Sequence, residues 1–282
     1  MWPLILILFA LILLVFSMLL NRLFHVKAVK HSSTPAELGI EFEEIHFPTK
    51  NGISLYGWWI QHPDGPECPA LILLHGWKRN LERMMPYIEN LHQHYNLLAF
   101  DARSHGSSGK DNYVSMPRFA EDIIAAIDFL KRGNINIIGV IGLSIGGAAA
   151  IYAASMDQRI KTIVTVGAFA DPGEVMKLEF QKKKIPYYPL GWLILEYVQF
   201  RIGNRFRNIA PDNNMAKTQA KILLIHGKED TTAPYQHAER LLKASVKNKV
   251  ELWGLEDKGH SDCHKEPGFW RRIQRFLEGS LK

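Results

Sequence analysis

The chain has 282 residues, of which 47% are hydrophobic and 22% are charged. This is the composition of a globular protein; it excludes a disordered or low-complexity chain and, after the apolar N-terminus, leaves enough residues for one large α/β domain or two smaller ones. The net charge of +6 comes from dispersed Lys and Arg residues, so we expect no nucleic-acid partner. The two cysteines form neither a disulfide framework nor a Cys-x-x-Cys metal site.

The first twenty residues carry no charged side chain, and as a helix they would be long enough to cross a hydrocarbon core of about 30 Å. A cleaved signal peptide is the rival interpretation, but no basic residue precedes the apolar run. We therefore expect a transmembrane anchor helix over residues 1–20, a linker over residues 21–39, and a single-pass membrane protein. Arg22, Lys27 and Lys30 follow the run, so the positive-inside rule predicts that the main domain is cytoplasmic.

The rest of the chain alternates between strand and helix patterns. Residues 40–49 and 53–62 are β-rich and flank Asn51-Gly52, which predicts a hairpin. Six further strands are predicted at 70–76, 96–101, 135–144, 160–169, 221–230 and 249–257, and five helices at 79–95, 117–133, 146–157, 235–246 and 269–279. Continuous apolar strands separated by helices are typical of a mostly parallel sheet covered on both faces, here with an antiparallel hairpin at one edge.

Residues 171–220 interrupt this alternation. They contain no clear strand pattern, and they include the apolar stretch from Ile185 to Phe200. We expect an insertion made of two or three short helices.

Gly142-Leu143-Ser144-Ile145-Gly146 follows a predicted strand and precedes a predicted helix. In a sharp strand-to-helix turn, side chains at the two glycine positions would clash with neighbouring backbone, and the serine hydroxyl is raised above the sheet. The N–H of Ile145 would then face an oxyanion. The alternative is a glycine-rich helix start that is capped by the serine.

A serine nucleophile needs a base and a carboxylate that orients the base. Asp230 and His260 follow the last two predicted strands, and the chain order Ser144, Asp230, His260 is the order expected after such an elbow. Asp262 and Glu229 are alternative orienting groups, each less favoured than Asp230, whereas Asp257, three residues before His260, could pair only locally.

A second oxyanion donor should come from the loop after the strand at 70–76. Trp77 follows His75-Gly76 there and offers its backbone N–H. We expect His75 to make structural hydrogen bonds, and the polar loop at 101–109 to support the elbow rather than to bind a metal.

Together, "HGW", "DARSHGSSG", "GLSIGG", "HGKEDTTAP" and "GHSD" resemble the motifs of the α/β-hydrolase fold superfamily of serine hydrolases, over residues 40–282. Ser104 departs from the pattern, since the family has glycine there. The resemblance implies an α/β-hydrolase fold, a helical lid at about 171–220, and acyl transfer by Ser144, His260 and Asp230 without a metal or cofactor. Trp77 and Ile145 would supply the oxyanion hole.

The predicted lid gives the one indication of substrate. Tyr188, Trp192 and Leu195 are candidates for its apolar pocket face, which favours carboxylic esters with lipid-like acyl groups or thioesters, and basic residues around it suggest contact with anionic membranes. A peptidase or amidase is the alternative, with an amine site built from the lid glutamates Glu174, Glu179 or Glu196. A binding protein without catalytic activity is a third reading.

Overall fold

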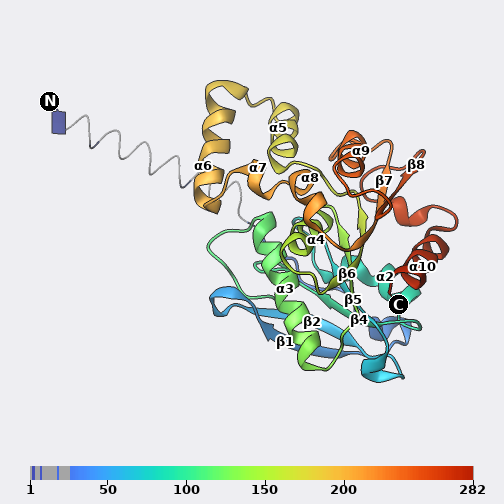
Figure 1. The fold of residues 1–282 in the computed structure, drawn as a ribbon. Coiled ribbons are helices and arrows are strands. Elements are labelled where there is room, and N and C mark those ends of the chain that lie inside the picture. The colour runs from blue at the N-terminus through green and yellow to red at the C-terminus, as the bar shows by residue number, and fades with distance from the viewer. Residues whose placement is uncertain (1, 4–6, 8–17, 19–25, 282) are drawn as a thin grey trace.

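The computed structural model describes residues 2–3, 7, 18 and 26–281 (Figure 1). Eight strands form a single sheet in the order β1-β2-β4-β3-β5-β6-β7-β8. Strand β2 pairs antiparallel with β1 and β4, whereas the remaining neighbours are parallel. The predicted fold class is therefore confirmed. The strands are β1 (Glu43–Pro48), β2 (Ser54–Ile60), β3 (Ala70–Leu74), β4 (Asn96–Phe100), β5 (Ile138–Leu143), β6 (Ile160–Val166), β7 (Lys221–Gly227) and β8 (Val250–Leu255).

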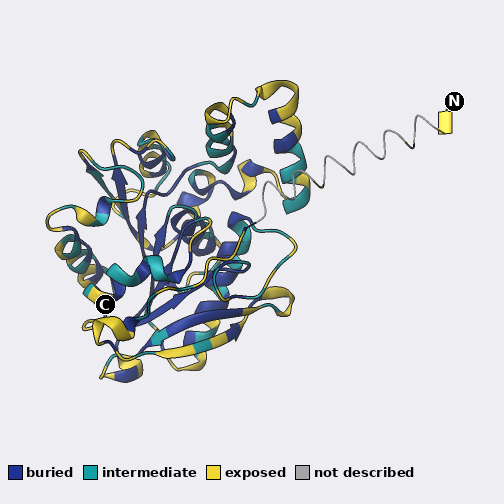
Figure 2. Ribbon diagram, turned by 180° about the vertical axis from the view of Figure 1, so that it is seen from behind, coloured by how far each residue is buried: buried dark blue, intermediate teal, exposed yellow. Residues whose placement is uncertain are grey.

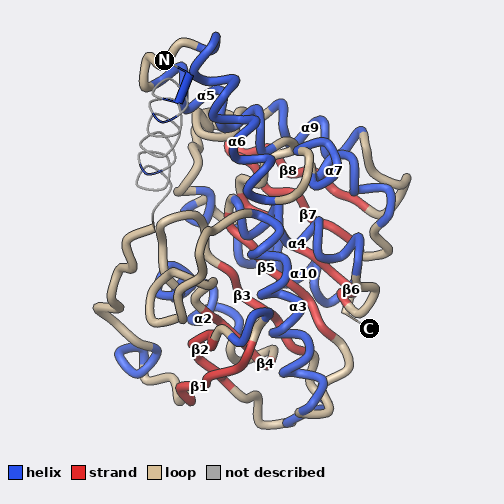
Figure 3. The backbone as a smooth tube through the Cα atoms, turned by 90° about the vertical axis from the view of Figure 1, so that its left-hand side faces the viewer, coloured by secondary structure: helices blue, strands red, loops and turns tan. Residues whose placement is uncertain are grey.

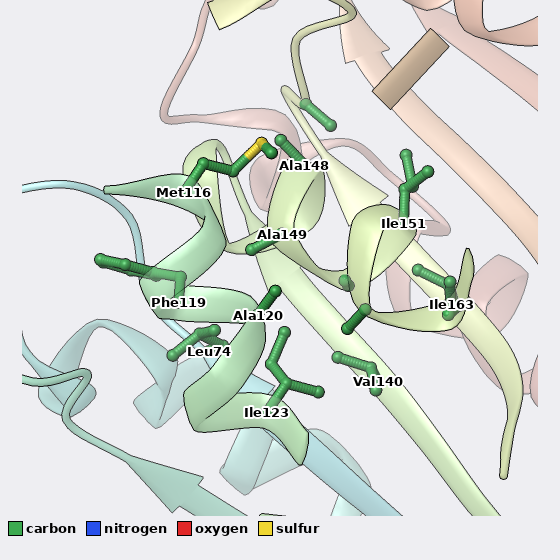
Figure 4. Packing of buried hydrophobic residues seen from close by; sticks show 14 of the residues in the cluster. Leu74, Met116, Phe119, Ala120, Ile123, Val140, Ala148, Ala149, Ile151 and Ile163 are labelled. Carbon is green, nitrogen blue, oxygen red and sulfur yellow. The ribbon is translucent and has the colours of Figure 1, made fainter. Parts of the chain in front are cut away.

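Both faces of the central strands are buried, because helices cover each face, whereas the edge strand β1 is largely exposed (Figure 2). Strand β3 is apolar throughout because its alternate residues face opposite sides of the sheet and both sides are buried. Ile72 and Leu74 belong to one core cluster, and Leu71 and Leu73 belong to the other. Helices α3 (Met116–Arg132), α4 (Ile145–Met156) and α9 (Gln236–Lys243) contribute to the first cluster, part of which is seen in Figure 4. Helices α2 (Met85–Leu91) and α10 (Phe269–Ser280) contribute to the second.

The helix predicted over residues 79–95 is shorter in the structure. A 3₁₀ turn, Leu81–Met84, comes first, and α2 begins only at Met85. Pro86 explains the boundary, because proline fits the first turn of a helix but not its interior.

The segment between β6 and β7 has no strand, as predicted. It contains four α-helices rather than two or three helices, α5 (Pro172–Lys182), α6 (Trp192–Ile202), α7 (Phe206–Ile209) and α8 (Pro211–Asn214), and in addition a π-helix (Tyr187–Gly191) and a 3₁₀ turn (Met215–Lys217). Helices α5 and α6 stand beside one another at one end of the sheet (Figures 1 and 3). We call residues 172–217 the helical segment.

The membrane localisation has to be corrected. In the part of the chain that the structure describes, no helix is both long and apolar enough to cross a bilayer. A span needs about 20 consecutive apolar residues, whereas α3, the longest helix described, has 17 and carries charged side chains. The prediction of a single-pass membrane protein with a cytoplasmic main domain is therefore wrong on this finding. The predicted anchor itself, residues 1–20, lies almost wholly outside the described residues.

Residues 29–33, expected within a linker, contact the domain. His31 Nε2 lies 2.9 Å from a carboxylate oxygen of the buried Asp101, and the imidazole ring stacks on Tyr56. Ser32 and Ser33 donate hydrogen bonds to Glu82. This stretch is therefore tied to the loops that follow β3 and β4.

Candidate active site

Ser144 lies in the turn between β5 and α4, with φ 54° and ψ −118°. A positive φ is strained for a residue other than glycine, and here two backbone hydrogen bonds hold it: Ser144 N donates to Val166 O at 2.8 Å, and Ala148 N donates to Ser144 O at 3.0 Å. A Cβ at Gly142 would lie 2.5 Å from backbone atoms of Gly146, and a Cβ at Gly146 would lie 2.7 Å from the carbonyl oxygen of His75. Both positions therefore require glycine.

The structure brings the predicted serine, histidine and aspartate together. His260 Nε2 lies 3.0 Å from Ser144 Oγ, and His260 Nδ1 lies 2.6 Å from Asp230 Oδ2. The other carboxylate oxygen of Asp230 accepts backbone hydrogen bonds from Thr232 and Ala233 at 2.8 and 2.9 Å. The aspartate side chain is fully buried, whereas the imidazole of His260 is 21% exposed and open to a substrate.

His226, at the end of β7, is a contributor that the sequence did not identify as part of the site. Its ring is buried, and its Nε2 lies 2.6 Å from the carbonyl oxygen of Ala233, so this nitrogen carries the proton. The same nitrogen lies 3.3 Å from Asp230 Oδ2. Burial alone would raise the pKa of Asp230, but the hydrogen bonds from His226 and His260 outweigh it and hold that pKa well below its usual range. Asp230 is therefore kept ionised.

The loop after β3 passes close to the nucleophile. A Cβ on Gly76 would lie 3.4 Å from Ser144 Cβ, and Trp77 lines the same cavity as Ser144. Ile145 is the first residue of α4, so its N–H has no acceptor within the helix. His75 is fully buried, and its Nε2 accepts a hydrogen bond from Ala102 N at 3.1 Å. Burial lowers the pKa of His75 and keeps the ring neutral, which fits a structural role.

The loop at 101–109 supports this arrangement. Asp101 accepts a hydrogen bond from Leu81 N at 2.7 Å, which ties the loop to the one after β3. The buried Arg103 donates to Asp122 at 2.9 and 2.6 Å and to Thr49 at 3.0 Å. Ser104 has φ 63°, a conformation that glycine adopts without strain, so the departure from the family pattern falls at a left-handed position.

A further histidine of this loop faces the backbone after Trp77. Lys78 N donates to His105 Nε2 at 3.2 Å, and His105 Nδ1 lies 3.0 Å from Arg103 O. Burial, followed by the influence of His75, lowers the pKa of His105 to about 4, so the ring stays neutral and can accept this bond. Lys78 itself has φ 56°, again a strained value.

Comparison with known proteins identifies the family. The model of the family described as "Alpha/beta hydrolase family" matches residues 71–269. The chain belongs to the α/β hydrolase family. The Escherichia coli K12 protein YfhR is 27% identical over 233 residues, which cover 79% of this chain and 75% of YfhR. The structure of the Pyrococcus furiosus esterase Pf2001 superposes with a TM-score of 0.74 at 26% identity, covering 91% of this chain and 97% of the esterase. The thiohydrolase aneE of Aspergillus aculeatus is 31% identical over 133 residues, 44% of this chain and 41% of aneE.

In this α/β hydrolase, a cavity of about 520 Å³ opens at Ser144 and His260. Its wall on the side of the helical segment is apolar except for Glu179 and Lys183, and the sequence did not identify which apolar residues form it. Its apolar side chains are Pro172, Val175, Met176, Phe180, Ile185, Val198, Ile202, Phe206 and Ile209. A volume of this size is in the usual range for small-molecule sites.

The structure does not bring the three predicted pocket residues of the helical segment to this cavity. Tyr188 and Trp192 are 71% and 43% exposed, and neither lines it. Leu195 is buried in the core cluster instead. Val198 and Ile202, which are four residues apart, present one face of α6 to the cavity.

The three glutamates considered for an amine site form ion pairs with neighbouring basic residues. Glu174 forms an ion pair with Arg240, Glu179 with Lys182, and Glu196 with Arg205. Their charges are therefore compensated by neighbouring bases, and an amine site built from them gains no support.

Among the described residues, the carboxylate that His260 Nδ1 bonds is that of Asp230, and the alternatives have other places. Asp262 accepts a hydrogen bond from Gly259 N at 2.8 Å and so shapes the loop that carries His260. Asp257 sits in a turn with φ 49°, and Glu229 N bonds the carbonyl oxygen of Lys258.

Proposed function

We propose that this α/β hydrolase is a serine hydrolase that cleaves carboxylic esters, lipid-like acyl esters and thioesters included, through an acyl-enzyme on Ser144. The observation that carries the proposal is the continuous chain of contacts from Ser144 Oγ to His260 at 3.0 Å and from His260 to Asp230 at 2.6 Å. A buried, ionised carboxylate that orients an imidazole toward a serine is the arrangement that makes the hydroxyl nucleophilic.

The proposed reaction has two halves. Ser144 Oγ attacks the carbonyl carbon and its proton passes to His260 Nε2, while the carbonyl π electrons move onto oxygen. The N–H groups of Trp77 and Ile145 hold that oxyanion; one such donor typically contributes about 10²–10³ in rate. When the tetrahedral intermediate collapses, the leaving group takes the proton from His260 Nε2. Water then hydrolyses the acyl-enzyme with the same imidazole as base.

We further propose that residues 40–282 form the hydrolase domain and that residues 171–220 act as its lid. The apolar wall that the helical segment contributes to the cavity supports this, since it would contact the acyl part of a substrate. The similarity to an esterase and, over a shorter stretch, to a thiohydrolase supports ester and thioester substrates.

Fluorophosphonate labelling of the full chain tests the proposal. We expect labelling of the wild type and of Ser155→Ala, a serine farther along α4, and none of Ser144→Ala. Unlabelled wild-type protein that is folded would contradict the proposal and favour a binding protein. A series of esters and thioesters from acetyl to dodecanoyl would then test the acyl preference. Faster turnover of short acyl groups than of long ones would refute the lipid-like part.

A further inference from the structure

One wall of the cavity is basic, and among the described residues no carboxylate pairs with its charges. Lys78, Arg79 and Arg83, which we call the basic arm, line the same cavity as Ser144. Lys78 and Arg79 are exposed, and Arg83 is half-buried. Within the described part of the chain, none of the three forms an ion pair with an acidic residue, although many other Arg residues do. The arm is thus free to bind an anion.

The rest of the described lining does not neutralise this charge. Glu179 is the one acidic residue among the described side chains that line the cavity, and it is paired with Lys182. Lys183 adds a further positive charge on the side of the helical segment. His264 also lines the cavity, and burial together with the charges of Arg83 and Lys265 lowers its pKa. The site is therefore a positively charged environment next to the nucleophile.

The backbone conformation of Lys78 also supports a functional role for its side chain. Its φ of 56° is a conformation in which glycine would be free of strain, yet a lysine occupies it and presents its side chain to the cavity. The bond from Lys78 N to His105 holds this conformation in place. Strained residues of this kind tend to occur at functional sites.

The position of Arg83 indicates which part of a substrate the arm meets. Its guanidinium donates a hydrogen bond to the carbonyl oxygen of Ser261, the residue after His260. Because His260 gives its proton to the leaving group, the leaving group must lie next to this imidazole. The apolar wall comes from the helical segment and suits the acyl chain, so the two walls suit the two ends of an ester.

We propose that the leaving group of the natural substrate carries an anionic group, a carboxylate or a phosphate, that binds the basic arm. This inference rests on the proposed ester hydrolysis and specifies its substrate class. Lys78, Arg79 and Arg83 supply charge-assisted hydrogen bonds to the anion. The alkyl chain of the acyl group lies against Met176, Val198 and their neighbours.

Matched esters of one acyl group test the proposal. The hexanoyl ester of 4-hydroxybenzamide is the neutral probe, and the hexanoyl esters of 4-hydroxybenzoate and of 4-hydroxyphenyl phosphate are the carboxylate and phosphate probes. For the wild type we expect kcat/KM to favour an anionic probe by about tenfold or more, roughly the effect of one hydrogen bond to a charged group. The preference should shrink as salt rises. Whichever anionic probe is preferred identifies the anion.

The variants Lys78→Gln, Arg79→Gln and Arg83→Gln should each lower the ratio of anionic to neutral turnover several-fold. Arg271→Gln, an exposed arginine on α10 outside the cavity, should leave that ratio at the wild-type value. Using the ratio within each variant removes any general loss of activity from the comparison.

The outcomes separate this proposal from the one it rests on. Hydrolysis of the neutral probe with an anion preference at or below one in the wild type, and no change in the three variants, would overturn the inference while leaving the hydrolase proposal intact. A preference for the 4-nitrophenyl monoester of adipic acid over 4-nitrophenyl hexanoate would move the anion to the acyl side and refute the assignment to the leaving group. Absence of both fluorophosphonate labelling and hydrolysis would instead defeat the proposed function.

Discussion

Replacing Gly142 by alanine tests how tightly the nucleophile turn is built. The new Cβ would lie 2.5 Å from the backbone carbonyl of Gly146 and from the nitrogen of Gly147. Favourable contacts between such atoms lie at about 3.5–4.0 Å, so the first turn of α4 would have to move by about 1 Å. No flexible side chain is available to give way, because the obstructing atoms belong to the backbone.

This displacement has two expected consequences. It moves Ser144 and the N–H of Ile145 relative to His260, and a misplacement of about 1 Å costs about 10²-fold in rate. Overpacking of this kind also destabilises the fold by about 1–3 kcal/mol. For a domain of this size each kcal/mol lowers Tm by about 2–4 °C.

Ester turnover and thermal unfolding measure these effects on the same sample. Gly279→Ala is the matched control, because a Cβ at that position in α10 meets nothing within 4 Å and should leave both rate and Tm near wild type. A Gly142→Ala protein with full activity and unchanged Tm would show that the turn can adapt, and the steric reasoning would then be refuted.

Three further predictions concern side chains. Asp230→Asn should reduce kcat by about 10⁴, as measured by ester hydrolysis, because the amide no longer fixes the tautomer of the imidazole. Arg103→Met should destabilise the protein by about 3–5 kcal/mol in urea unfolding, because the buried carboxylate of Asp122 loses its cationic partner. Burial disfavours the charged form of His31, but the contact with Asp101 and the nearby carboxylates outweigh it and raise the pKa of His31. The stabilisation from His31 should therefore be complete below its ordinary pKa of about 6.5 and lost as pH rises through the higher folded value, and comparing wild type with His31→Gln at about pH 6 and about pH 9 measures it.

A specific result would contradict each of these three predictions. The role of Asp230 would be refuted by an asparagine variant that retains wild-type kcat. The double variant Arg103→Met/Asp122→Leu should recover much of the stability lost in the single one, and the absence of recovery would mean that the lost packing, rather than the unpaired carboxylate, dominates. A stability difference for His31 that stays constant between the two pH values would exclude a contribution from its charge.

The strands and the position of the serine turn could be predicted because both follow from local patterns in the sequence. The continuous apolar residues of β5 predict a buried strand, and Gly142, Ser144 and Gly146 indicate the turn that follows it. Asp230 and His260 could be placed near Ser144 because parallel strands end at the same edge of a sheet. The distances that join them were not predictable.

The cavity walls were harder to predict, since they depend on how whole elements pack. Apolar residues occur all along α6, and the sequence does not reveal that Val198 and Ile202 face the cavity while Trp192 faces solvent. Arg83 lies in a 3₁₀ turn that reads as part of a longer helix, so its approach to Ser261 had no sequence signal. His226 could have been noticed, because it lies four residues before Asp230 at the end of β7.

At Gly146 the serine turn passes so close to the loop after β3 that an added Cβ would lie 2.7 Å from the carbonyl oxygen of His75. Because this approach involves backbone atoms only, it is kept when the side chains of the two loops change. The helical segment, by contrast, meets the cavity through side chains that can be exchanged one at a time. New substrate preferences can therefore arise, by natural divergence or by engineering, through changes confined to residues 172–217, while the inherited chemistry is left undisturbed.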